Sequence, residues 1–253
     1  MPKAAPADQT EFLMDPPSTE PATHTVLSSL RERILTGQIA PGVRLRAEAL
    51  ATEMNVSRTP IRSALAVLSA EGVVQYSVNR GYTVRPVTIG DILASVEVRA
   101  ALEGTAARLS VEHGWEPAEL ARLADCAAKG RAIVDRGGWS APIEAEWYAL
   151  NWIFHRSINI AARNPVLRNA MRMTILAPVT GDVIRTSPVV AAQVPQRLRQ
   201  IPATPPEHIL RSQADHEAIL KAIRGDDAGE AERLMTAHVM ATKTRVHALA
   251  TLR

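Results

Sequence analysis

The chain of 253 residues is long enough for two domains, one small and one of ordinary size. Its net charge is only +3, but residues 24–86 hold eight arginines against four acidic residues, an excess that suits contact with phosphate groups. The single Cys126 excludes an internal disulfide and is typical of a reducing compartment. No stretch approaches the roughly 18 apolar residues of a membrane span, and no secretory signal begins the chain, so we expect a cytoplasmic protein with no membrane partner.

The first part of the chain predicts a leader followed by short helices. Residues 1–23 are rich in Pro, Ala and acidic residues, which predicts a disordered leader. Apolar positions at helical spacing predict a helix over 26–35. A Pro-Gly turn at 41–42 and a short extended piece precede a short helix over 47–54, and residues 55–56 form a tight turn into the next helix.

Residues 57–72, SRTPIRSALAVLSAEG, predict a helix with one buried and one arginine-bearing face. Ser57 is expected to cap its start through the side chain, and Gly72 to end it in the left-handed conformation. The predicted buried stripe consists of Ile61, Ala64, Leu65 and Leu68. Taken alone, the arginine-bearing face is most simply a solvated surface, but arginines at a helix start can also read guanine edges and clamp phosphates.

The flanking residues favour the second interpretation. Two helices joined by so few residues form a helix-turn-helix, and residues 73–84 alternate as a β-hairpin around a turn at 79–81. Three helices followed by a hairpin make a winged helix. The sequence therefore predicts a winged helix-turn-helix DNA-binding domain over 24–86.

At this point residues 37–84 resemble the winged helix of the GntR family nearly end to end. The matching landmarks are Pro41-Gly42, Leu45, Leu50-Ala51, Val56 to Pro60, Arg62, Ala64-Leu65, Leu68, Glu71-Gly72, Arg80-Gly81 and Val84. The resemblance implies a dimeric bacterial transcription regulator, usually a repressor, that binds an inverted-repeat operator in double-stranded DNA.

The resemblance also implies which residues contact DNA. Carried over by position, these are Ser57, Arg58, Thr59 and Arg62 in the recognition helix, with Arg80 and Gly81 at the wing. Glu48 stands where some relatives have an arginine at the start of the second helix. The nearby Arg44 and Arg46 are the expected substitutes as phosphate contacts.

Residues 87–253 predict a second, all-α domain, an antiparallel bundle for effector binding and dimerisation. Helical patterns cover 89–113, 117–136, 139–162, 166–176, 207–224 and 226–252, and no strand pattern is convincing. The fold class is therefore mainly α: an N-terminal winged helix-turn-helix and a C-terminal helical bundle.

Residues 178–206 interrupt this pattern with six prolines and no sustained period, apart from a short helix expected near 196–200. So long a structureless connection usually forms a lid, a binding loop or a disordered segment. A tolerated insertion, a partner surface and an effector lid all remain open.

Four polar residues of the bundle form a second constellation. Asn151 and His155 are four residues apart and share a helix face, while His216 and His238 lie in apolar surroundings on two later helices. Each histidine alone is most simply a core residue with a satisfied ring. Together they are candidates to converge on a metal ion.

This pattern resembles the helical FCD domain of the FadR-like branch of GntR regulators, through residues 98–109, 154–167 and 215–239. In metal-binding members an aspartate four residues before a histidine, with two later histidines, holds a divalent ion, and an organic acid completes its coordination. The matching positions here are Asn151, His155, His216 and His238, so a neutral amide replaces the carboxylate. The resemblance implies a Zn, Ni or Mn class ion and a small carboxylate effector.

Arg99, in the family's R-x-x-L-E pattern, is a candidate to pair with the effector carboxylate. Alternatively it pairs with Glu103 one turn on. We therefore predict a ligand-responsive regulator and no enzyme. The alternatives are a metal-dependent hydrolase, against which no catalytic fingerprint is present, and a nonspecific architectural DNA-binding protein, which leaves the second domain unexplained.

Overall fold

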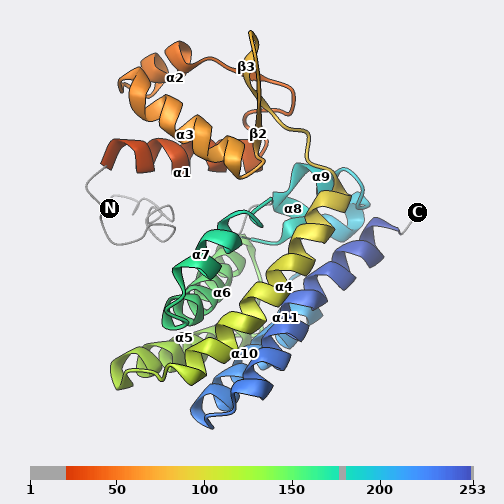
Figure 1. Cartoon of the computed structure of the whole chain (residues 1–253). Helices are drawn as coiled ribbons and strands as arrows, with labels where there is room; N and C mark the ends of the chain where they lie inside the picture. Colours follow the sequence, from red (N-terminus) through yellow and green to blue (C-terminus); the bar gives the residue numbers. More distant parts are fainter. Residues whose placement is uncertain (1–20, 177–180, 252–253) are drawn as a thin grey trace, which may run out of the picture. The chain divides into compact units, whose positions relative to one another are not determined.

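The computed structural model describes residues 21–176 and 181–251, which form parts of two compact units divided between Val87 and Thr88 (Figure 1). Most of the leader predicted over 1–23 lies outside the described residues. Its last three residues are wrongly assigned, because the first helix already begins at Pro21. None of the helices among the described residues is long and apolar enough to cross a membrane.

The first unit is a winged helix. Its elements are α1 (Pro21–Leu35), β1 (Arg44–Leu45), α2 (Ala47–Glu53), α3 (Arg58–Ala70), β2 (Val74–Ser77) and β3 (Gly81–Val84). The strands form an antiparallel sheet in the order β1-β3-β2, with Tyr76 opposite Tyr82. Helix α1 packs against α3. The predicted apolar stripe of α3 is buried in one core with apolar residues of α1 and of the sheet.

The structure tests the predicted start of α3 at Ser57 and its predicted end at Gly72. Ser57 is the N-cap residue, but its side chain makes no capping hydrogen bond, so that part of the prediction is wrong. The hydroxyl instead lies on the exposed surface. Gly72 has φ +72°, which confirms the predicted left-handed stop, and the next amide, of Val73, donates back to Leu68 O at 2.9 Å.

The second unit is helical, and no strand occurs in the part of it that the structure describes. Its main helices are α4 (Ile89–Glu112), α5 (Pro117–Asp135), α6 (Ala141–Ala161), α7 (Pro165–Arg172), α10 (Glu207–Arg224) and α11 (Ala228–Ala250). Helices α4 and α11 run side by side for most of their length (Figure 1). Thr88 and Asp91 form a capping box that fixes the start of α4.

The proline-rich segment is more ordered than its sequence predicts. Within 181–206 it forms α8 (Val183–Thr186), α9 (Pro188–Ala191) and the 3₁₀ helix η2 (Gln196–Arg199), the last of which confirms the short helix expected near 196–200. Helix α7 ends at Arg172, four residues before the predicted end at 176. Pro188 at the first position of α9 and Pro195 at the N-cap of η2 separate these single turns from the residues before them.

The close contact between α4 and α11 depends on a glycine. A Cβ placed on Gly104 would lie 2.0 Å from Thr236 Oγ1 and 3.1 Å from the backbone oxygen of Glu232. Because both atoms belong to or lie near the backbone of α11, the helices would have to separate to accommodate a methyl group. The contact therefore sets the spacing of two helices that carry residues of the site described below.

We predict that Gly104→Ala lowers the free energy of unfolding by about 1–3 kcal/mol, the usual effect of overpacking a buried contact. Urea denaturation measures the change. Gly138→Ala is the matched control, since nothing lies within 4 Å of a Cβ there. Thr236→Ala in the Gly104→Ala background should recover part of the loss, and unchanged stability of Gly104→Ala would contradict the steric argument.

Candidate functional site

The predicted DNA-contacting residues form an exposed surface of the winged helix. Ser57, Arg58, Thr59 and Arg62 lie in and before the first turns of α3, and all four are exposed. Arg58 donates to Glu48 Oε1 at 3.0 Å, and this ion pair is open to solvent, with side chains 68% and 80% exposed. Glu48 thus partly neutralises a predicted DNA contact, at the position where the family resemblance leads one to expect an arginine.

The other predicted DNA contacts come from segments before and after α3 in the sequence. Arg80 is exposed and Gly81 partly exposed at the turn between β2 and β3. Arg44 and Arg46 are exposed at β1 and at the N-cap of α2. The arrangement offers several guanidinium groups, which suits contact with a phosphate backbone.

The helical unit brings the three predicted histidines together. His155 comes from α6, His216 from α10 and His238 from α11, and their ligand nitrogens all lie within 4.8 Å of one another. His155 and His216 are buried, and His238 is almost so. Helices that are distant in sequence therefore supply one compact imidazole cluster.

Two carboxylates fix the ring orientations within this cluster. His155 Nδ1 contacts Glu103 Oε2 closely, and His238 Nδ1 lies 3.1 Å from Asp215 Oδ2. Since an ionised carboxylate only accepts hydrogen bonds, each Nδ1 carries the donated proton, which leaves Nε2 as an acceptor in a neutral ring. The two Nε2 atoms face each other at 3.2 Å, an arrangement that needs a proton or a cation between them.

His216 completes the cluster with a buried ring nitrogen. Its Nε2 has no hydrogen-bond partner among the described residues. The ring stacks on Phe154, with centroids 4.3 Å apart, and more distantly on Trp147. A buried ring nitrogen without a partner is costly, and in the tautomer with its proton on Nδ1 the coordination of a cation would satisfy Nε2.

Burial and neighbouring charges favour neutral rings at His216 and His238 and an ionised carboxylate at Glu103. Desolvation lowers the pKa of His216 well below its usual value, and the nearby His238 and His155 lower it further. Desolvation also lowers the pKa of His238, although Asp215 opposes the change. Burial alone would raise the pKa of Glu103, but His155 and Arg99 outweigh it and hold this pKa at about 2. Neutral imidazoles backed by ionised carboxylates are typical donors for a divalent metal.

A cavity of about 420 Å³ opens beside the cluster. Asn151, His155 and His238 line it, whereas His216 lies behind its wall. Asn151 is one helical turn before His155 on α6, as predicted, and is half-buried. The structure therefore brings together the predicted residues from α6 and α11 on one cavity surface.

Arg99 pairs with Glu103, as one of the two interpretations made from the sequence has it, and its pairing with an effector carboxylate stays a prediction. It lines the cavity, and its Nε lies 2.7 Å from Glu103 Oε1 one turn on. The Nε–H is not aligned for a hydrogen bond, so the contact is an ion pair. Arg99 thus joins the cavity wall to the carboxylate that holds His155.

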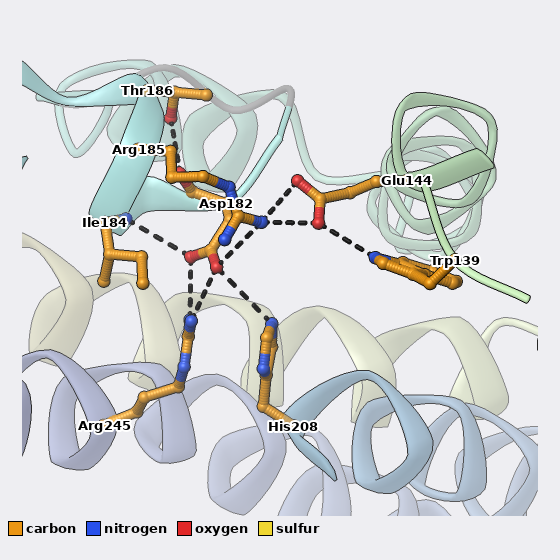
Figure 2. A network of polar contacts seen from close by, with 8 residues as sticks. All are labelled: Trp139, Glu144, Asp182, Ile184, Arg185, Thr186, His208 and Arg245. Atoms are coloured by element: carbon orange, nitrogen blue, oxygen red, sulfur yellow. Dashed lines mark hydrogen bonds and ion pairs between the residues drawn. The ribbon is translucent and has the colours of Figure 1, made fainter. Parts of the chain in front are cut away.

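Two features of the site were not predicted from the sequence: the carboxylate partners of the histidines and a second polar group. Glu103 stood within an apolar stripe, where an acid is a signal of a buried partner, and Asp215 directly precedes His216. Asp182, in the proline-rich segment, had no such signal. It is 0% exposed and accepts from Arg245 through two bonds of 2.8 and 2.6 Å (Figure 2).

Comparison with known proteins decides the family. Residues 22–84 match the family described as bacterial regulatory proteins, gntR family, and residues 94–241 match the FCD domain. The chain belongs to the GntR family. It combines the DNA-binding winged helix of these transcription regulators with the helical, ligand-binding FCD domain, which confirms the predicted fold class and family.

Individual relatives agree with this assignment. The chain is 32% identical over 180 residues to a probable D-xylose utilization operon transcriptional repressor from Paenarthrobacter nicotinovorans, covering 67% of this chain and 76% of the relative. It is 24% identical to the transcriptional repressor RspR from Escherichia coli (strain K12), covering 87% of both chains. The solved structure of E. coli McbR/YncC shares the fold, with a TM-score of 0.61 at 21% identity over 90% of this chain and 97% of the other.

We predict that the chelator-treated protein becomes less stable between pH 7.5 and pH 5.5. An unfolded histidine binds a proton near pH 6.5, whereas the lowered pKa of His216 keeps the folded imidazole neutral, so acid favours the unfolded chain. The loss is at most about 1.4 kcal/mol per pH unit for each such imidazole. Urea denaturation at both pH values measures it. His216→Phe should lose less, the exposed His247→Gln should behave as the wild type, and equal losses in all three proteins would contradict the prediction.

Proposed function

We propose that the protein is a repressor that binds an inverted-repeat operator as a homodimer and is controlled by a small organic acid in the FCD cavity. The observation that carries the proposal is the joining, in one chain, of an arginine-bearing winged helix to a cavity lined by histidines of the imidazole cluster. The names of two relatives, both described as repressors, support the direction of control.

Within this proposal each DNA contact has a role. Arg62 and Arg58 read base edges or clamp phosphates from α3, while Ser57 and Thr59 bond the backbone at its start. Arg44, Arg46 and Arg80 contribute phosphate contacts, and Gly81 brings the wing close to the minor groove. Because the duplex fixes the spacing of two half-sites, an effector that changes the separation of the two recognition helices releases the operator.

The residues of the imidazole cluster fit a divalent metal ion. His155, His216 and His238 would hold it through Nε2, with the amide oxygen of Asn151 as a weaker fourth donor. The unsatisfied Nε2 of His216 and the carboxylates behind the other two rings support this assignment. Such an ion would supply a positive charge that binds the effector carboxylate, and Arg99 would orient that group from the cavity wall.

We predict that Arg62→Ala weakens operator binding by about 1–3 kcal/mol. The measurement is a fluorescence anisotropy titration of the full chain on the DNA upstream of its own gene, with a scrambled duplex alongside. The exposed Arg122→Ala, in the helical unit, is the matched control for loss of one positive charge. Equal affinity of the wild type for operator and scrambled DNA would disprove specific recognition.

The metal assignment predicts opposite effects for two substitutions. His216→Ala should lower the affinity for Zn²⁺ by at least about tenfold, since even outer-shell partners of metal ligands have effects of that size. Asn151→Asp should raise it, because a carboxylate is a charged and stronger ligand than an amide. Equilibrium dialysis followed by metal analysis measures both, with His247→Ala as the control. Zn²⁺ binding that neither substitution alters would place the ion elsewhere.

A further inference from the structure

The cavity has a second polar end, two helical turns away from the imidazole cluster. Each of three helices places one polar side chain at either end of the cavity, and the two side chains are seven residues apart in the chain. The pairs are Tyr148 and His155 on α6, His208 and Asp215 on α10, and Arg245 and His238 on α11. Seven residues advance a helix by about 10 Å. The far end, defined by Tyr148, His208 and Arg245, is therefore separated from the imidazole cluster by the length of a small organic acid.

A carboxylate of the chain itself already occupies the far end. Asp182, from the start of the proline-rich segment, lines the cavity and accepts two hydrogen bonds from Arg245 at 2.8 and 2.6 Å (Figure 2). A fork of this kind is the geometry in which arginine recognises a carboxylate ligand. The far end is thus an anion site whose occupant is covalently part of the protein.

Further contacts hold this carboxylate in place. Asp182 Oδ1 accepts from the amide of Ile184 at 3.2 Å, and Oδ2 lies 3.2 Å from Arg185. Arg185 in turn contacts Glu144, which also accepts from the indole of Trp139 at 3.0 Å (Figure 2). The network closes the far end with its charges compensated.

His208 provides a polar group at the same end that the network leaves unsatisfied. Its Nε2 lies 3.7 Å from Asp182 Oδ2, beyond hydrogen-bond distance, and has no hydrogen-bond partner among the described residues. The side chain lines the cavity. An uncharged polar group of a ligand can therefore form a hydrogen bond with His208 Nε2.

We propose that Asp182 fills a second anion site of the effector cavity, so that the effector is an acid with one carboxylate and an uncharged distal end. The inference rests on the proposed function, in which the first carboxylate binds beside the imidazole cluster. Asp182 then acts as a specificity residue, because it excludes acids that carry a second carboxylate.

A free dicarboxylate is a poor competitor for this position. A tethered group acts at an effective concentration of roughly millimolar or above, and Asp182 would also lose its bonds to Ile184 and Arg185 on leaving. Substitution of Asp182 by a small residue removes the competitor and leaves Arg245 free. The wild type should therefore prefer monocarboxylates, and the variant dicarboxylates of matching length.

The test is calorimetric titration of the full chain, with and without added Zn²⁺, using butyrate and hexanoate against succinate, glutarate and adipate. Asp182→Ala should gain roughly tenfold to a hundredfold in affinity for the best dicarboxylate, the range expected of one charge-assisted, bidentate contact. Asp182→Asn keeps the side-chain shape, folds with less perturbation and should show a smaller gain. The double variant Asp182→Ala/Arg245→Gln should lose the gain.

Glu144→Gln is the matched control, because it removes one buried negative charge from the same network without changing a residue of the cavity lining. It should bind the acids as the wild type does. A wild type that already binds dicarboxylates as tightly as Asp182→Ala, or variants with unchanged preference, would overturn the inference and leave the proposed function intact. Failure of every acid to bind any of the proteins would overturn both.

Discussion

An ionised carboxylate cannot be buried without partners, and in the FCD domain Glu103 meets this constraint with residues from other turns and helices. Its oxygens contact His155 of α6 and Arg99 of its own helix, and these two partners hold the pKa of the buried carboxyl at about 2, against the desolvation that would raise it. The contact orients the His155 ring, which orients Nε2 toward His238. Loss of Glu103 would therefore disturb the cavity wall, the imidazole cluster and the packing of α4 together.

The same physical solution occurs twice along the cavity. At one end carboxylates of Glu103 and Asp215 hold imidazoles, and at the other the carboxylate of Asp182 holds a guanidinium group. In the second case the carboxylate comes from the proline-rich segment, for which the sequence left an insertion, a partner surface and an effector lid open. Asp182 is the N-cap residue of the short helix α8, and its ion pair with Arg245 joins the segment to α11. The segment thus becomes part of the cavity wall.

Local sequence was enough to predict most of the fold. In α3 the apolar spacing, the cap position of Ser57 and the left-handed Gly72 all follow from interactions within a few residues, so the helix was recognisable with both its ends. The side-chain cap at Ser57 was wrong, because the hydroxyl is free to face solvent. The end of α7 was mispredicted, and α8 and α9 were not predicted, whereas the short helix near 196–200 was.

The sequence by itself determined the winged helix, the helical bundle and the grouping of the three histidines in one cluster. The reason is that helical periodicity and family motifs lie within short segments of the chain. Only the tertiary structure decided which carboxylates contact these histidines and which carboxylate lies at the far end of the cavity. Glu103, Asp215 and Asp182 reach their partners across 52, 23 and 63 residues, and no local pattern encodes such pairs. Burial makes those pairs obligatory, and burial is a property of the folded chain.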